Sequence, residues 1–242
     1  MRDAERYVVA IGALGTALEA EAKALADDLG STAYEERLKL VGGVPAIVLT
    51  TRDGNAAQAL VAKLRGRGHR AQLCRVSEVV PASAMILLRQ FQLDDDALGT
   101  GRERLPWSDI SALIRARHQR TATSVDIVKD TKFDLGRAIV TGGLMTRKTE
   151  KREVVTRSEI TEQVLYLFRA SGRLPWILRE HSAHYGALGA ALAPSAMLNF
   201  TIAVEQFRAR ASQARFDDTL LRRTAHVDVD LYAHLVATAS PT

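Results

Sequence analysis

The sequence has little of what would tie it to a membrane or to an oxidising compartment. Cys74 is the single cysteine among 242 residues, so no internal disulfide framework can form, and a lone thiol fits a reducing compartment. The longest apolar runs, such as residues 7–13 and 44–49, are far shorter than the ~20 residues that span a bilayer. Residues 1–6 mix both charge signs and lack the basic start and long apolar stretch of a secretory signal. We therefore expect a cytoplasmic protein that is not an integral membrane protein.

The sequence also lacks a segment in which charges of one sign dominate. The net charge is +5, but residues 77–212 hold 19 basic residues against 15 acidic ones, and no segment is strongly basic. A dedicated nucleic-acid binder more often shows a one-signed stripe. The content of 47% hydrophobic and 25% charged residues is instead typical of a soluble globular protein with one large domain or two of ordinary size.

No stretch has the residue types and spacing that a known chemistry requires. Residues 12–15 (GALG) follow a predicted strand, but the full dinucleotide fingerprint and a Walker lysine are missing, so a simple packing turn is favoured. Neither a Ser-His-Asp phrase nor a nucleophile elbow nor a paired-carboxylate signature stands out. We expect no bound cofactor or metal, and whether the chain has enzymatic activity stays open, with the balance against it.

The N-terminal third alternates strand-like and helix-like segments. Thr32 precedes a short helical pattern with Glu35 three residues later, which is the capping-box arrangement, and Gly30 ends the helix before it. Asp53-Gly54 starts a further helix. The predicted order is βααβαβ, with strands at 7–13, 46–51 and 70–76 and helices at 14–29, 33–41 and 55–67.

This order and several positions resemble the C-terminal domain of the bacterial ribosomal stalk protein. The matching positions are residues 32–41 (TAYEERLKLV), Pro45, residues 57–60 (AQAL), Leu64 and Gly68-His69. The resemblance covers about residues 5–76 and predicts a stalk-protein-like α/β domain over residues 1–78. In that family, basic positions on the first helix and a Glu/Lys pair on the second help to dock translational GTPases. Here Glu35 and Arg37 roughly match the pair, but Lys23 is the only basic residue of the first helix, so the fold is carried over without the function.

The period changes near Pro81, after which strand-like runs are closed by one helix. Strands are expected at 85–93, 105–114, 121–128 and 133–141, with a polar turn region at 94–104. The runs 164–169 and 174–179 predict a hairpin across residues 170–173, and Ser195 caps a helix over 196–210. The charged segment 142–162 is left open as a long excursion between two strands, a separate β-ribbon or a helix. A short helix is expected within residues 220–239.

This second pattern resembles the bacterial pleckstrin-homology-like domains. In these domains an early strand often reads like LPWSDI, here residues 105–110, and the last helix often starts with a Ser-x-x-x-Asn-Phe-like phrase, here residues 195–200. The resemblance covers residues 83–212 and leaves 213–242 as a C-terminal extension. The predicted fold class is α+β, with a small N-terminal βααβαβ domain followed by an antiparallel β-sheet or barrel domain closed by a C-terminal helix.

Two sets of residues are candidate contacts with a partner. The strongest basic feature, residues 147–152, would bind phosphates or anionic lipid headgroups through its cationic side chains, although interleaved glutamates are more typical of a solvated, ion-paired face. Trp107 and Trp176 each follow Leu-Pro, where an aromatic side chain can dock a partner peptide, but a place in the core is favoured because Trp contributes a large apolar area. The four cationic residues of the first set are Arg147, Lys148, Lys151 and Arg152.

The remaining chemistry-bearing residues favour structural interpretations. Glu180, His181 and His184 form the densest group of metal-ligand types, yet zinc normally needs three or four protein ligands, and solvated loop histidines are the better interpretation. Cys74 lies in a predicted core strand, where a free cysteine usually behaves as a small hydrophobe.

The leading hypothesis from sequence is a non-enzymatic interaction or regulatory protein that binds a protein partner at a sheet edge or across the domain interface. A second hypothesis is binding to nucleic acid or an anionic membrane surface through residues 147–152. A third is an enzyme whose site assembles only in three dimensions. The oligomeric state is left undetermined.

Overall fold

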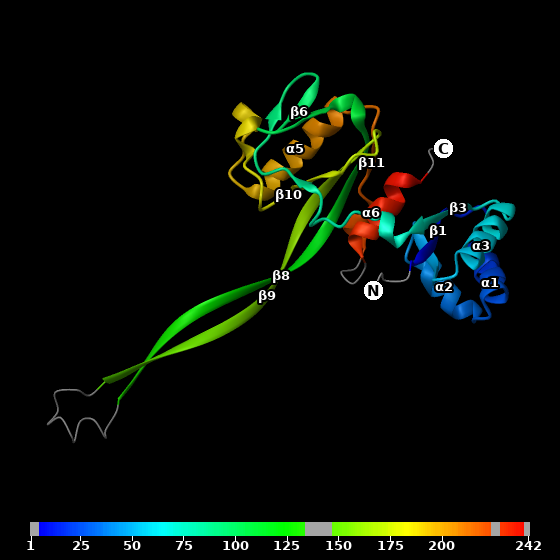
Figure 1. Cartoon of the computed structure of the whole chain (residues 1–242), viewed down its shortest axis with the longest axis horizontal. Helices are drawn as coiled ribbons and strands as arrows, with labels where there is room; N and C mark the ends of the chain where they lie inside the picture. Colours follow the sequence, from blue (N-terminus) through cyan, green and yellow to red (C-terminus); the bar gives the residue numbers. More distant parts are fainter. Residues whose placement is uncertain (1–4, 134–146, 224–227, 240–242) are drawn as a thin grey trace. The chain divides into compact units, whose positions relative to one another are not determined.

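A computed structural model of the chain describes residues 5–133, 147–223 and 228–239, with the side chains of residues 120–160 set aside (Figure 1). The chain divides into two compact units. Unit 1 comprises residues 1–118 and 162–242, and unit 2 comprises residues 119–161. Helices and mixed sheets together give the predicted α+β class.

The N-terminal part of unit 1 has the predicted βααβαβ order. Strand β1 lies between β2 and β3 and pairs antiparallel with both. Thr32 and Glu35 form the expected capping box at the start of α2, and Asp53 caps α3. The elements are β1 (Tyr7–Ala13), α1 (Leu18–Leu29), α2 (Ala33–Val41), β2 (Ala46–Thr51), α3 (Gly54–Gly66) and β3 (Arg70–Arg75).

The two faces of this small sheet have different neighbours. Val9 and Ile11 of β1 join the core formed with the three helices, which includes Leu25, Leu40 and Leu64. Val8 and Ala10 face the other way, since successive side chains of a strand alternate, and belong to a separate apolar cluster. The sheet is therefore buried on both sides, as the continuous apolar run 7–13 indicates.

The rest of unit 1 is built on a five-stranded sheet in the order β11-β8-β9-β10-β4 and a three-stranded sheet in the order β5-β6-β7. The hairpin between β9 and β10 and the helix α5 appear as predicted, and Ser195 caps α5. The elements are β4 (Ile86–Leu87), β5 (Gln92–Leu93), β6 (Ala97–Gly99), β7 (Arg104–Pro106), β8 (Ile110–Phe133), β9 (Arg147–Arg169), β10 (Trp176–Arg179), α5 (Ala196–Arg210) and β11 (Arg215–Asp217).

The prediction of one continuous strand over residues 85–93 is wrong. The segment forms β4 and β5, which belong to different sheets, and β6 lies within the region expected to be a turn. The break has a local cause, because the N–H of Leu88 donates to Ile177 O at 2.9 Å while the N–H of Arg89 turns back to Leu87 O at 3.1 Å. The chain thus leaves one sheet and enters the next within four residues.

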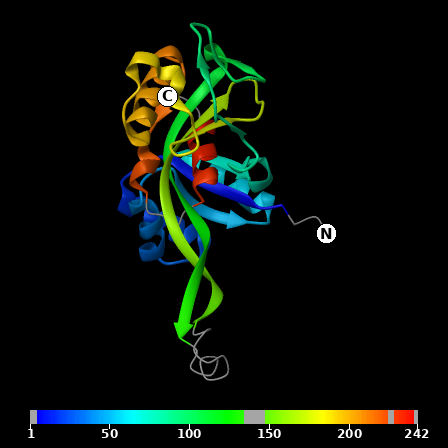
Figure 2. The same ribbon diagram turned by 90° about the vertical axis from the view of Figure 1, so that its left-hand side faces the viewer.

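The separate strands expected at 105–114 and 121–128 are also wrong, because β8 runs without a break from Ile110 to Phe133. No glycine or proline interrupts these residues, so nothing local stops the strand. Of the strand expected at 133–141, only Phe133 is among the described residues. Strand β9 begins at Arg147, so the β-ribbon is the alternative that the structure adopts for the described part of 142–162. In unit 2, β8 and β9 twist around each other (Figure 2).

Helix α6 (Val229–Thr238) connects the two parts of unit 1. Leu231 and Leu235 pack with Val8 and Ala10 against the N-terminal sheet. Residues on its other side, including Ala233 and Val236, pack in the cluster of the five-stranded sheet. The helix expected within 220–239 is therefore present, and it packs against both the N-terminal sheet and the five-stranded sheet.

Among the described residues, no single helix is long and apolar enough to cross a membrane. Among the same residues, the 3-10 helix Tyr185–Ala191 and α5 have the length and composition of a membrane span when they are taken together. They are bent by 83° at their junction. Phe200, Val204 and Phe207 of α5 are buried in the core of unit 1.

Candidate functional site

The outer side of α2 carries large apolar side chains that remain exposed. Tyr34 is 67% exposed, Leu38 54% and Val41 57%. Their spacing of four and three residues places them along one side of the helix. The buried residues of α2 are Glu36 and Leu40, which lie on the opposite side. The apolar side of this helix therefore faces outward.

A polar anchor explains this orientation. The carboxylate of Glu36 is 1% exposed and accepts hydrogen bonds from the Ser31 hydroxyl at 2.7 Å and from Lys39 Nζ at 2.7 and 2.9 Å. Lys39 Nζ also donates to Val48 O on β2 at 3.2 Å. A buried charge must keep such partners, so the network fixes which side of α2 faces the sheet.

The loop after α2 carries one more exposed apolar side chain. Val44 is 39% exposed, and Arg223 holds the loop by donating from Nη2 to Gly43 O at 2.7 Å and to Pro45 O at 2.6 Å. We call Tyr34, Leu38, Val41 and Val44 together the α2 face.

A second group of exposed apolar residues lies around the start of α5. Leu192 and Met197 are each 54% exposed and Leu198 is 48% exposed. The side chain of Asn199 accepts from Ala193 N at 2.7 Å and donates to Ala193 O at 2.9 Å, which holds the chain before the helix against its first turn. This group is smaller than the α2 face and has no exposed aromatic residue.

A polar cluster around the buried Tyr166 joins β8, β9 and α6. The Tyr166 hydroxyl donates to Asp230 Oδ1 at 2.7 Å and lies 2.7 Å from His118 Nε2. The N–H of Ala82 donates to Asp230 Oδ2 at 2.8 Å. Because the hydroxyl gives its one hydrogen to Asp230, the His118 Nε2–H faces two acceptors, the phenol oxygen at 2.7 Å and Asp230 Oδ1 at 3.4 Å. Each of these polar groups is thus satisfied within the cluster.

The electrostatics of this cluster keep Asp230 ionised and Tyr166 neutral. Burial alone would raise the pKa of Asp230, but hydrogen bonds from His118, the Ala82 N–H and Tyr166 lower it below its ordinary value. Burial, reinforced by the charge of Asp230, raises the pKa of Tyr166. The arrangement fixes α6 on the sheet.

A second buried cluster joins α1 to the turn before β3. Glu21 is 1% exposed, and Arg67 donates to its two oxygens from Nη2 at 2.6 Å and Nε at 3.0 Å. His69 Nε2 lies 2.5 Å from Glu21 Oε2, while His69 Nδ1 accepts the N–H of Gly15 at 2.9 Å. Arg67 also donates to Asp28 at 2.7 Å. Hydrogen bonding to Glu21 is the main cause that raises the pKa of Arg67.

The predicted basic contacts Arg147, Lys148, Lys151 and Arg152 lie on β9 within unit 2. Their side chains are outside the described part of the structure. The backbone shows that the segment is a paired strand, so a role in anion binding stays a prediction.

Both tryptophans lie in the core, as the favoured interpretation predicts. Trp107 is 4% exposed and its Nε1–H donates to Asp94 O at 3.0 Å. Trp176 is fully buried, and among the described residues no hydrogen-bond partner lies near its Nε1. Neither ring is exposed at the surface of unit 1.

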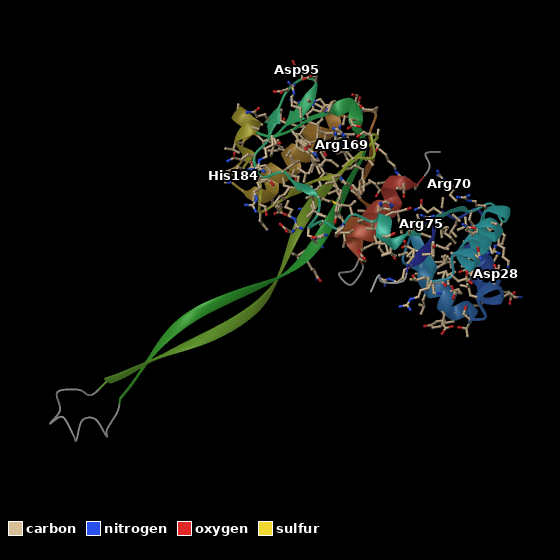
Figure 3. The ribbon with its side chains drawn as sticks, in the orientation of Figure 1. Asp28, Arg70, Arg75, Asp95, Arg169 and His184 are labelled. Carbon is tan, nitrogen blue, oxygen red and sulfur yellow. The ribbon has the colours of Figure 1, made fainter. Side chains whose placement is uncertain are left out.

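The residues Glu180, His181 and His184 are not brought together as metal ligands. His181 Nε2 lies 4.0 Å from Glu180 Oε1, and Glu180 Oε2 accepts the N–H of Gln163 at 3.1 Å. His184 is exposed at the surface of unit 1 (Figure 3). Within residues 5–119, 161–223 and 228–239, whose side chains are described, no group of three or more His, Cys, Asp or Glu side chains is arranged to hold a metal ion.

Cys74 and the Gly12–Gly15 turn have structural roles, as predicted. Cys74 is 3% exposed, and burial raises the pKa of its thiol to about 11, so it is protonated and inert at neutral pH. At Gly15 an added Cβ would lie 2.2 Å from Gly68 O, which shows that this turn packs closely against the one before β3.

The comparisons with known proteins add no relative: no family model, no curated protein and no solved structure matches the chain. The resemblances to the ribosomal stalk protein and to pleckstrin-homology-like domains therefore stay predictions.

Sequence reasoning missed the α2 face as a surface. The spacing of Tyr34, Leu38 and Val41 is visible in the sequence, but an apolar helix side is usually the buried one. The signal against burial was Glu36, which lies three and four residues before Lys39 and Leu40 and so on the same side of the helix. Its meaning depends on contacts with Ser31 and β2 that only the fold provides.

Proposed function

We propose that the protein is a non-enzymatic, cytoplasmic interaction or regulatory protein and that it binds a protein partner through the α2 face. The observation that carries this proposal is the outward exposure of Tyr34, Leu38 and Val41 on a helix whose other side is anchored. An aromatic anchor amid aliphatic side chains is typical of an interface centre. We also take residues 1–78 and 83–212 as stalk-protein-like and pleckstrin-homology-like scaffolds, neither of which requires a reaction.

The charges around the α2 face indicate what its partner offers. Arg37 directly precedes Leu38 on α2. Its side chain is 49% exposed, and its Nε lies 3.7 Å from Glu19 Oε1, which is a long contact. That exposed ion pair contributes little, so Arg37 is available to a partner carboxylate. The partner segment is expected to be apolar and bordered by an acidic side chain.

A variant with Leu38→Lys and Val41→Lys tests this proposal. Tagged wild type, the variant and a matched control with Leu192→Lys are purified from the native extract at moderate salt after nuclease treatment, and co-purifying proteins are quantified by mass spectrometry. We expect the recovery of one partner protein to fall about tenfold or more with the double variant, since two interface-centre side chains are lost. Its recovery is expected to stay unchanged with Leu192→Lys. Equal recovery with all three proteins contradicts the proposal.

The ribbon of unit 2 supports a second candidate function, nucleic-acid binding. Residues 147–152 lie at the start of β9, next to β8 in the sheet order, and β8 ends with Lys129 and Lys132 in its last five residues. A two-stranded ribbon fits the major groove of DNA, and lysine and arginine on it bind phosphates.

Reversal of four charges tests this second candidate. Replacing Arg147, Lys148, Lys151 and Arg152 with glutamate is expected to abolish duplex binding in a fluorescence anisotropy titration, and wild-type binding is expected to weaken steeply with salt. Binding that survives the reversal would place the contact elsewhere, and binding to anionic vesicles alone would replace nucleic acid with a membrane surface.

A further inference from the structure

A cavity of about 620 Å³ lies in unit 1, lined by residues from α3, β3, β11 and the end of α6. Its volume is in the range of ~300–1,000 Å³ that is common for small-molecule sites. The residues that line the cavity do not include any residue of the α2 face. The cavity therefore lies in a different part of unit 1 from the proposed protein interface.

The lining of this cavity is basic. Arg65 from α3, Arg70 from the first position of β3 and Arg215 from the first position of β11 all contribute to it. Among the described residues that line it, none is acidic. Guanidinium groups match phosphate oxygens in pairs, so three of them around one cavity favour a phosphate-bearing ligand over a neutral one.

Two of these arginines are held in place by backbone carbonyls. Arg65 Nε donates to Ala71 O at 2.9 Å, and Arg215 Nη1 donates to Val236 O at 2.9 Å and Ala239 O at 3.3 Å. A guanidinium has five N–H donors, so these bonds orient the groups and leave other donors for a ligand. Among the described residues, the carboxylate contact of Arg215 Nη2 is a long one, at 3.6 Å from Asp217 Oδ2.

Two negative groups near the cavity, among the described residues, are already compensated. The last carbonyls of α6 carry the negative end of the helix dipole, and Arg215 binds two of the carbonyls there. His69 lines the cavity and contacts Glu21, but the Glu21 carboxylate is bound on both oxygens by Arg67. The described charged side chains that line the cavity are therefore its arginines.

The geometry points to a site for the phosphate group of a small phosphomonoester. The guanidinium groups of Arg65, Arg70 and Arg215 bind the phosphate, and the organic part lies against Leu73 and Ala71 in the remaining volume.

Titration calorimetry with three probes tests this inference on the full chain: inorganic phosphate, adenosine 5′-monophosphate and adenosine. We expect the two phosphate probes to bind at one site and adenosine not to bind. Arg70→Gln is expected to weaken phosphate binding about tenfold or more, the effect of losing a charge-assisted hydrogen bond. Arg75→Gln is the matched control, because Arg75 lies at the other end of β3, outside the cavity lining (Figure 3).

The outcomes separate specific recognition from general charge attraction. The inference is supported if Arg75→Gln binds as wild type and if Arg70→Lys, which keeps the charge but not the fork, binds more weakly than wild type. It is overturned if neither phosphate probe saturates up to about 10 mM, if adenosine binds as well as its phosphate, or if the two glutamine variants lose affinity equally. Thermal unfolding of each variant confirms that the fold is intact.

Discussion

Replacing Glu21 with alanine is expected to lower the free energy of unfolding by about 3–5 kcal/mol, because removing one partner of a buried ion pair leaves the others uncompensated. In wild type, Glu21 is 1% exposed and binds both Arg67 and His69. The alanine variant leaves His69 Nε2 with the Thr16 hydroxyl at 3.5 Å, and it leaves the Arg67 guanidinium with Asp28 as its carboxylate partner. Chemical denaturation followed by circular dichroism measures this difference as a shift of the midpoint.

The matched control for this variant is Glu19→Ala, on the same helix and one turn or less away. Its side chain is 72% exposed, and its ion pair with Arg37 is 3.7 Å long, so the midpoint is expected to stay close to that of wild type. If both variants unfolded at the same denaturant concentration, the buried cluster would not be a major source of stability. A loss confined to Glu21→Ala would show that α1 is fixed to the β3 turn by this cluster.

The burial of Glu21 has a signal in the sequence, but its partners do not. Glu21 lies four residues before Leu25 and next to Ala22, which places it on the apolar side of α1. An acid at that position predicts a buried partner. His69 and Arg67 are 48 and 46 residues away, and a single sequence contains no information that selects them from the other basic residues.

The elements that could be predicted well are those with explicit start and stop signals. Thr32 with Glu35 gave the start of α2, and Ser195 gave the start of α5, whose bounds match the expected 196–210. The elements predicted poorly are the strands of residues 85–133. There, strand propensity shows that a residue is extended, but which sheet it joins depends on partners such as Ile177 for Leu88.

The candidate surface and cavity were harder to predict than the fold for a related reason. Predicting the α2 face depends on knowing that Glu36 faces inward. Predicting the basic cavity depends on knowing that Arg65 and Arg70 line the same cavity as Arg215, which lies about 145 residues later along the chain. Charge counts along the sequence drew attention to residues 147–152 because those residues are consecutive. A site assembled from three separate elements leaves no such local concentration of charge.

The second large effect is expected at Asp230, where α6 is attached to the five-stranded sheet. Replacing Asp230 with alanine is expected to lower the free energy of unfolding by about 2–4 kcal/mol, since two buried residues, Tyr166 and Ala82, lose the acceptor of their hydroxyl and N–H. Because α6 also packs Leu231 and Leu235 against the N-terminal sheet, the loss is expected in both parts of unit 1. Tryptophan fluorescence and hydrogen exchange of β1 report on the two parts separately.

The same carboxylate makes stability depend on pH with a definite sign. The pKa of Asp230 in the folded chain lies below its ordinary value of 3.8, so its contribution is fully present above that value and is lost as the pH falls through the lower folded pKa. Other carboxylates with lowered pKa values, such as Asp28, contribute in the same direction, so only the difference between proteins is informative. Asp230→Asn is expected to lose less stability than wild type between neutral pH and pH values below 3.8. Parallel curves for the two proteins would show that Asp230 is not held ionised by His118 and Tyr166, and that α6 is retained by its apolar contacts alone.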